Sequence, residues 1–329
     1  MKTKNPIISI IIKTLNEEAN IKRTLDSCIK ATKDISAEII LADSLSTDKT
    51  IAIAKKYPIR IVQLINPEDR SCGIGPQLGY QYAKGDFIYI LDGDMEFEKN
   101  FLETAINEFN KDSTLGGVAG QVREMRAVNI VFKNRQKSTN KKVTELEFVD
   151  KLEMGGIYRR KALESIGYFS NRNLHAYEEA DLGFQLINNG WKLCRLPVPG
   201  IKHYGYDTTS FGVFRKRWKT GYVKGSGELL RAALGKKHFF KVAWHLKIYV
   251  FVIFWWLLGL VSSFLLSKFV KYFLLTTGII LLLFLLKKRS IKQWLFSLIS
   301  WHFSAVGLIR GFFSKQINPT DKISSKVIK

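Results

Sequence analysis

The sequence predicts an α/β fold with a mostly parallel, doubly wound sheet, followed by a helical membrane region. Three observations support this prediction. Short β-branched runs alternate with amphipathic stretches over about the first hundred residues, which is the pattern of strand–helix–strand units. Each run ends in a polar loop, and in such sheets these loops gather along one edge. From residue 248 onward, long uncharged segments have the length of membrane-spanning helices.

The first two strands are each followed by a polar loop and a helix. Residues 7–12 are an almost unbroken run of isoleucine, and Thr14 begins the loop that follows this run. Glu17 then stands at the start of a helix, where an acid suits the positive end of the helix dipole. Residues 38–42 repeat the apolar run, and a second polar loop begins at Asp43. Both units therefore present polar side chains where a strand ends.

The fourth predicted strand is the centre of the sheet. A third strand, residues 59–64, leads into a glycine-containing loop with Arg70, and residues 87–91 then form a continuous apolar run. Such a run is typical of a strand buried on both faces. It ends in Asp92 and Asp94, whose spacing suits a divalent cation that holds a diphosphate, Mg²⁺ or Mn²⁺ alike. The simpler interpretation is a polar turn, since Asp and Gly are ordinary turn residues.

The charge and cysteine content point to a membrane surface and a reducing compartment. The formal charge is +22, and residues 211–247 contain ten basic residues and one acid just before a hydrophobic segment. Basic residues beside a membrane helix favour the anionic cytoplasmic leaflet, so the charge needs no nucleic acid partner. The three cysteines are scattered and lack metal-binding spacing. The N-terminus has too short an apolar run for a signal peptide, which places the first domain in the cytosol.

A series of motifs carries a family resemblance. In chain order they are TLNEE, ADSLSTDKT, LDGDM, MGGIYRR, YEEADLGFQL and FRKRW. In order and spacing they resemble family 2 glycosyltransferases of the GT-A fold, over about residues 5–235. The resemblance implies a GT-A domain over residues 1–235, with a nucleotide-sugar half, 1–100, and an acceptor half, 101–235. Single motifs also fit capped helix starts and turns.

The resemblance implies a donor pocket at the first two strand ends. Asp43 would accept a hydrogen bond from the nucleobase, and Thr14, Glu17 and Arg70 would line the same pocket. Many relatives have two acids at this point of the motif, and Ser44 stands in the second place here.

The resemblance also implies a metal site. Asp92 would approach the ribose or the metal, and Asp94 would ligate a metal that bridges the diphosphate and offsets the charge on the leaving group. His203, at the end of the last predicted strand, is a candidate for an additional metal ligand or a phosphate donor. A lone histidine is more often structural.

The acceptor half would supply the base. Relatives usually have Asp where Glu179 stands, and that residue acts as general base; Asp181 is the alternative. Acids are also common at a helix N-terminus for electrostatic reasons alone. Gly155 and Gly156 would let the backbone approach the sugar, although a tight turn explains them nearly as well. Residues 122–147 are polar and aperiodic, and we expect a mobile excursion over the site.

The FRKRW element resembles a motif of membrane-associated relatives. Arg217 and Trp218 suit a diphosphate and a sugar face. The alternative is a basic juxtamembrane helix that holds lipid headgroups. Phe214 stands where Gln or Arg is usual, which weakens any prediction of processive polymerisation.

The C-terminal part is predicted to be a membrane region. A basic linker, residues 236–247, precedes two transmembrane helices over 248–267 and 269–286. Residues 291–313 form a third helix, and 314–329 a basic tail. If the third helix crossed, the tail would lie outside, against the positive-inside rule, so we expect an interfacial or re-entrant helix.

The sequence therefore predicts a membrane-anchored, inverting, metal-dependent glycosyltransferase at the cytoplasmic face of the cell membrane. It would transfer a sugar from a nucleoside diphosphate donor to a polyprenyl-linked acceptor among membrane lipids. The alternatives are transfer to polyprenyl phosphate, which needs no base, a processive synthase, and a non-catalytic membrane scaffold. A nucleic-acid binder is disfavoured because the basic cluster adjoins the first membrane segment. The sugar, the nucleobase, the acceptor and the oligomeric state stay open.

Overall fold

The structure is a computed structural model of the 329-residue chain. It describes residues 7–98, 100–126, 130–139, 144–153, 155–205, 209–264 and 267–329. Met154 of the MGGIYRR motif, part of the predicted excursion and two positions of the first predicted membrane helix lie outside the described residues. The chain divides into two compact units. The first contains the residues up to Val213 together with Lys315–Lys329, and the second contains Phe214–Ser314.

The first unit is built on one mixed sheet. Among the described residues it has ten strands, in the spatial order β10-β3-β2-β1-β4-β8-β6-β9-β5, with β7 beside β9. The strand bounds are β1 Ile8–Thr14, β2 Ala37–Asp43, β3 Arg60–Leu64, β4 Phe87–Asp92, β5 Met95–Phe97, β6 Leu115–Glu124, β7 Glu147–Phe148, β8 Gly156–Arg159, β9 Lys192–His203 and β10 Ser325–Val327.

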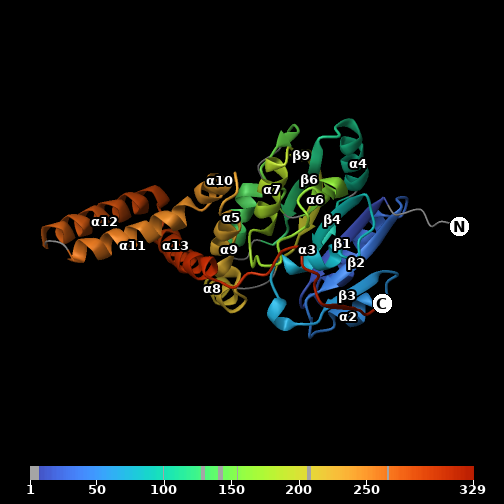
Figure 1. Cartoon of the computed structure of the whole chain (residues 1–329), viewed down its shortest axis with the longest axis horizontal. Coiled ribbons are helices and arrows are strands. Elements are labelled where there is room, and N and C mark those ends of the chain that lie inside the picture. The colour runs from blue at the N-terminus through green and yellow to red at the C-terminus, as the bar shows by residue number, and fades with distance from the viewer. Residues whose placement is uncertain are drawn as a thin grey trace. The chain divides into compact units, whose positions relative to one another are not determined.

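Four neighbouring strands, β3, β2, β1 and β4, run parallel, as the sequence predicts (Figure 1). Their register places Thr14 beside Asp43 and Lys13 beside Asp92. Polar residues that are far apart in the sequence thus meet at the carboxyl edge. Beyond β4 the sheet is mixed, because β8 runs antiparallel to both β4 and β6. The sheet is thus mixed: the strands of the nucleotide-sugar half up to β4 are all parallel, as predicted, and in the acceptor half β6 and β9 are again parallel to each other.

Two apolar layers cover the two faces of this sheet. Ile10 and Ile12 belong to one core, which includes residues of α1 and α4. Ile11 belongs to the other core, with residues of α3, α6 and α7. Alternate side chains of β1 enter opposite cores because strand side chains alternate between faces, and this explains the unbroken isoleucine run. The helices of the first unit are α1 Ile21–Ala31, α2 Thr50–Ala54, α3 Ile74–Tyr80, α4 Phe101–Lys111, α5 Ile130–Thr139, α6 Arg160–Glu164 and α7 Glu178–Asn188, with a 3-10 turn at Pro67–Asp69.

The predicted excursion over residues 122–147 contains a helix, α5, which the sequence analysis missed. Its three apolar residues are consecutive, Ile130 to Phe132, and a polar stretch follows, so the helical period is absent from the sequence. Phe132 is buried and fixes the helix to the unit.

The second unit is helical. It contains the end of α8 (Ser210–Lys219), a 3-10 turn at Tyr222–Lys224 that is η2, and the helices α9 Gly225–Ala232, α10 Phe239–His245, α11 Lys247–Phe264, α12 Ser267–Lys288 and α13 Ile291–Phe312. Three of these, over Lys247–Phe264, Lys268–Lys288 and Ile291–Phe312, are long and apolar enough to cross a membrane. The predicted linker, residues 236–247, is largely helical because it contains α10.

The predicted domain boundary at residue 235 differs from the unit boundary after Val213. The reason is close packing between α13 and the segment formed by η2 and α9. A Cβ atom on Gly307 would collide with the carbonyl oxygen of Val223, and one on Gly311 with that of Lys224. These glycines let the backbones approach closely, so residues 214–235 pack with the membrane-type helices.

The predicted basic tail, residues 314–329, belongs mostly to the first unit instead of the membrane region. Its strand β10 pairs antiparallel with β3, and Figure 1 shows the C-terminus at that edge of the sheet. Ile323 is fully buried in one core, and Ile328 packs against the other. The side chain of Gln81 accepts from the backbone N–H of Ile323 at 2.6 Å. One buried and one partly buried isoleucine thus account for the placement of a segment that composition alone describes as basic.

Candidate active site

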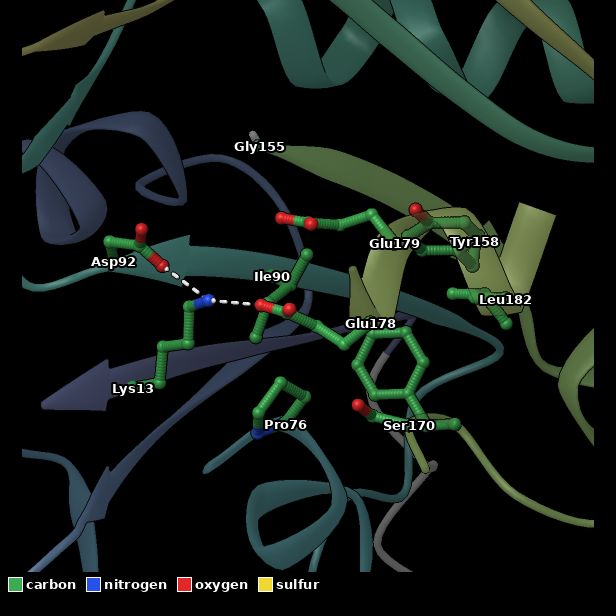
Figure 2. A pocket seen from close by; sticks show the side chains of 11 residues that line it. Lys13, Pro76, Ile90, Asp92, Gly155, Tyr158, Ser170, Glu178, Glu179 and Leu182 are labelled. Carbon is green, nitrogen blue, oxygen red and sulfur yellow. Dashed lines mark hydrogen bonds and ion pairs between the residues drawn. The ribbon is translucent and has the colours of Figure 1, made fainter. Parts of the chain in front are cut away.

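A pocket opens where the carboxyl ends of β1 and β4 face the start of α7 (Figure 2). It contains about 360 Å³ of empty space, the open mouth included. The sheet contributes Lys13 and Asp92, and the helix contributes Glu178 and Glu179. The remaining lining residues are Pro76, Ile90, Gly155, Tyr158, Phe169, Ser170 and Leu182. Side chains from the predicted donor and acceptor halves therefore meet in one cavity.

Lys13 joins the two halves of this pocket. Its ammonium nitrogen lies 3.0 Å from Asp92 Oδ1 and 3.1 Å from Glu178 Oε1 (Figure 2). Burial acts to lower the pKa of Lys13, but the charges of Asp92 and Glu178 outweigh it and hold the pKa well above its usual range. Burial raises the pKa of Asp92, against the opposing effect of Lys13. Lys13 is therefore a fixed positive charge between two carboxylates.

The two adjacent glutamates at the start of α7 have different environments. Glu178 is buried and bonded to Lys13. Glu179 is half-buried, and its carboxylate extends over Ile90 towards the Asp92 side in Figure 2. Burial and the nearby charge of Glu178 raise the pKa of Glu179 to about 7. A carboxylate with that pKa suits proton transfer near neutral pH.

Asp181, the alternative base, has structural contacts. Its side chain is 1% exposed, and Oδ2 accepts hydrogen bonds from Tyr168 at 3.2 Å and from Gln185 at 2.9 Å. It does not line the pocket described above. The geometry therefore favours Glu179 over Asp181 as the residue that meets a substrate.

Asp94 and His203 come together, as the sequence analysis anticipated for a shared site. His203 Nε2 lies 3.4 Å from Asp94 Oδ2, and Nδ1 lies 2.7 Å from Glu124 Oε1. Burial acts to lower the pKa of His203, but these two carboxylates raise it to about 9. Burial acts to raise the pKa of Asp94, and the interaction with His203 overcomes it and lowers the pKa. With a carboxylate at each ring nitrogen, His203 is positioned as an imidazolium, which cannot ligate a metal without losing a proton.

The residues present fit a divalent cation in one specific way. Asp94 Oδ1 is buried and has no hydrogen-bond partner among the described residues. An unpartnered buried carboxylate oxygen two residues from Asp92 is the kind of ligand that Mg²⁺ or Mn²⁺ prefers. The described residues include no cluster of three or more His, Cys, Asp or Glu side chains that could hold a metal by themselves. A divalent cation at Asp92 and Asp94 would therefore need further oxygen ligands from a substrate, as is usual for Mg²⁺.

The predicted nucleobase residues lie at the next strand ends and support one another. Asp43 is fully buried, and it accepts hydrogen bonds from Thr14 Oγ1 at 3.1 Å and from Gln63 Nε2 at 2.8 Å. Arg70 donates to the carbonyl oxygens of Ser44 and Leu45, both at 2.8 Å. In this arrangement, Asp43 and Arg70 shape the loop after β2, and base recognition by Asp43 stays a prediction.

Steric constraints explain why glycine occupies three positions of the predicted site. Gly155 lines the pocket with φ of +74°, which favours glycine, and its carbonyl accepts a hydrogen bond from Tyr89. Gly156 begins β8, and a Cβ atom there would lie 2.9 Å from a methyl carbon of Leu152. Gly93, between the two aspartates, leaves room for the side chain of Glu17, whose Cγ would lie 2.8 Å from an added Cβ.

Arg217 and Trp218 belong to the second unit. The guanidinium of Arg217 lies over the ring of Tyr222, and that of Arg310 lies 4.4 Å from the ring centre of Trp218. Trp218 also lines an apolar groove with residues of α13, among them Phe303. The structure therefore brings these two residues to the helical unit, and their predicted contact with a substrate stays a prediction.

The sequence analysis missed Lys13, Glu124 and Gln63. Lys13 carried a detectable signal, because a lysine at the end of a buried strand next to an acidic strand end needs a counter-charge. Glu124 and Gln63 carried none, since their partners are distant in the sequence and meet through sheet pairing.

Comparisons with known proteins agree with this geometry. Residues 9–167 match the profile of Glycosyl transferase family 2. The dolichyl N-acetyl-alpha-D-glucosaminyl phosphate 3-beta-D-2,3-diacetamido-2,3-dideoxy-beta-D-glucuronosyltransferase of Methanococcus voltae is 24% identical, over 72% of this chain and 76% of its own length. The O-antigen chain rhamnosyltransferase WbaN of Salmonella anatum is 25% identical over 56% of this chain, which spans 62% of that relative.

A solved structure matches the fold. S. aureus TarS 1-349, in complex with UDP-GlcNAc, superposes with a TM-score of 0.54 at 18% identity, covering 70% of this chain and 67% of that one. At this identity the likeness concerns the fold. The family profile covers the strand ends that build the pocket, and the two relatives are named as transferases of sugars, so residues 9–167 are a domain of glycosyl transferase family 2.

Proposed function

We propose that this glycosyltransferase transfers a sugar from a nucleoside diphosphate donor to a hydroxyl group of a polyprenyl-linked acceptor, with inversion. The observation that best supports this proposal is the different environment of the two adjacent glutamates at the start of α7. Glu178 is neutralised by Lys13, whereas Glu179 has a pKa of about 7 and reaches into the pocket. A base of this kind is required when the acceptor is a neutral hydroxyl.

The proposed reaction is a single in-line displacement. Glu179 takes the proton of the acceptor hydroxyl while the acceptor oxygen bonds to the anomeric carbon. The bond between that carbon and the diphosphate oxygen breaks, and its electron pair leaves with the nucleoside diphosphate. Asp94 and Asp92 would hold a divalent cation that offsets the charge on the leaving group. Gly155 lines the pocket with backbone alone, so the sugar can lie against the backbone.

Both substrates are supported by relatives. The TarS structure of the same fold holds UDP-GlcNAc, which supports a nucleotide sugar as donor here. The Methanococcus relative is named for a dolichyl-linked acceptor, which supports a lipid-linked saccharide. Candidate membrane helices in this chain would confine enzyme and lipid to the same surface.

Chain connectivity supports the proposed topology. The second unit leaves the first after Val213, and the chain returns to it at Lys315. Because both ends are on the side of the catalytic unit, the membrane is crossed an even number of times. At most two of the three candidate helices then span it, which supports an interfacial or re-entrant α13. The basic residues before α11 favour the cytoplasmic side for the catalytic unit.

A donor screen tests the proposed function. Purified protein is incubated with UDP-, GDP- and dTDP-sugars and membrane lipid extract, and released nucleoside diphosphate is measured. We expect release with one donor class, dependent on the lipid extract and lost in Glu179→Gln. Release that persists in Glu179→Gln would favour polyprenyl phosphate as acceptor, since that anion needs no base. No release with any donor and extract would contradict the proposed function.

A further inference from the structure

The pocket contains a half-buried cation to which the proposed reaction assigns no role. Lys13 lines the pocket at the end of β1, with its side chain 20% exposed. It lies between Asp92 of the donor half and Glu178 of the acceptor half (Figure 2). Neither carboxylate can move away from the pocket without breaking an ion pair that is at least partly shielded from water.

The bonding of Lys13 leaves capacity for a substrate. An ammonium group has three N–H donors. Asp92 Oδ1 and Glu178 Oε1 account for two of them in the described structure. The third can meet an acceptor in the pocket, and the two ion pairs hold the nitrogen in place before a substrate arrives.

The charge of the pocket requires such a contact. Asp92, Glu178 and Glu179 carry up to three negative charges around one ammonium when all are ionised. A diphosphate that enters this space meets carboxylates on both sides, and like charges at short distance in a shielded site repel strongly. Lys13 is the positive side chain among the residues that line the pocket. Its ammonium is therefore the natural contact for an incoming phosphate oxygen.

We propose that Lys13 binds an oxygen of the donor's diphosphate and stabilises the charge on that group as the nucleoside diphosphate leaves. This inference rests on the proposed function, because it assumes a diphosphate donor. Lys13 keeps its proton throughout, and the electron pair of the broken carbon–oxygen bond stays on the diphosphate. A compact ammonium suits a role shared with a divalent cation, since both act as point charges.

Pyrophosphate binding tests the inference without knowledge of the donor. Isothermal titration of inorganic pyrophosphate is carried out on the full chain in detergent, with Mg²⁺ and again with EDTA. The EDTA arm removes effects that a Lys13 substitution could exert through a metal at Asp92. We expect Lys13→Gln to weaken pyrophosphate binding about tenfold or more in both arms, as the loss of a charged hydrogen bond does. Lys13→Arg should retain part of the affinity.

The control is Lys151→Gln. Lys151 is similarly exposed, at 29%, and pairs with Glu153 at 3.0 Å outside the pocket lining. The Lys151→Gln protein should bind pyrophosphate with the affinity of the wild type. Lys13→Gln leaves the charge of Glu178 without its ion-pair partner, which could prevent folding. In that case the double variant Lys13→Gln with Glu178→Gln, which removes both charges of the pair, is used in its place. Steady-state kinetics should give a lower kcat for Lys13→Gln, since the contact strengthens as charge develops.

The outcomes separate the inference from the proposed function. Unchanged pyrophosphate affinity in a folded Lys13→Gln protein, or in the double variant compared with Glu178→Gln alone, would overturn the inference, and Lys13 would be a structural ion-pair partner. If the wild type also failed to bind pyrophosphate and released no nucleoside diphosphate, the proposed function itself would fall. Weaker binding in Lys13→Gln and wild-type binding in Lys151→Gln would support the inference.

Discussion

The two compact units differ in the interactions that they contain: ion pairs at strand ends in the first unit, and apolar helices with glycine contacts in the second. In the first unit, charged side chains are buried at strand ends, where Lys13 and His203 each contact two carboxylates. In the second, α11 and α12 expose most of their apolar side chains, and glycines allow close helix contacts. The site in the first unit therefore depends on individual ion-pair partners. The helix packing of the second unit depends on apolar composition and on glycines at the contacts. The predictions below test this contrast, from the largest expected effect to the smallest.

The largest effect is expected at Glu179. Glu179→Gln should lower turnover about a hundredfold or more, because positioned proton transfer contributes about that much. Donor binding should change little. Glu179→Asp should retain part of the activity, and Asp181→Asn should mainly lower the melting temperature. Wild-type turnover in Glu179→Gln together with an inactive, folded Asp181→Asn would move the base to Asp181.

A metal effect is expected at Asp94. Mutation of a residue that merely hydrogen-bonds to a metal ligand typically weakens metal binding roughly 10–100-fold. Asp94→Asn removes a ligand itself, so it should weaken Mg²⁺ or Mn²⁺ binding by more than that. The reason is that Oδ1 of Asp94 is buried and unpartnered among the described residues. Titration calorimetry with the metal and pyrophosphate measures this, and EDTA should abolish turnover of the wild type. Full turnover in EDTA would contradict metal dependence.

Packing in the second unit can be tested with two glycines. Gly307→Leu should destabilise the protein by about 1–3 kcal/mol, as overpacking does, because its side chain would collide with the carbonyl of Val223. Gly278→Leu is the matched control, since an added Cβ there has no atom within 4 Å. Thermal unfolding in detergent compares the two. Equal stability of both variants would mean that close packing of α13 on η2 is unimportant.

The pH dependence of activity should report Glu179. Its pKa of about 7 lies above the usual value for a carboxyl group, and the ionised form is the base. The rate should therefore rise about tenfold per pH unit below 7 and level off above it, because protonation removes the base. The profile of kcat/KM between pH 5.5 and 8.5 measures this. A flat profile in the wild type would contradict the assignment.

The smallest expected effect is an absence of labelling from outside the cell. In a background in which Cys72 is replaced by Ala, single cysteines are placed at Lys237 and Lys326, both of which are exposed. A membrane-impermeant thiol reagent should reach neither in intact cells, and it should reach a cysteine at Lys268, at the start of α12. External labelling at Lys326 would contradict an even number of crossings.

The sequence predicted most of the first unit because its signals are local. Apolar runs located β1, β2, β3 and β4, and the polar residues at the end of the fourth run singled out Asp92 and Asp94, whereas Glu179 was singled out only by the family resemblance. What the sequence could not supply depends on pairing between distant segments. The placement of β10 beside β3 joins residues more than two hundred positions apart, and the partner of His203, Glu124, meets it through the pairing of β6 with β9. The boundary of the second unit was missed for the same reason, since Gly307 and Val223 meet only in the folded chain.

The return of the chain to the sheet sets an order of biosynthesis. The edge strand β10 follows α11, α12 and α13 in the chain, so the ribosome makes it after the three long apolar helices. The edge of β3 therefore stays unpaired until these helices have been made, and unpaired edges invite wrong pairing. Residues 315–329 thus complete the sheet late: the first unit acquires β10 only after α11, α12 and α13 have been synthesised.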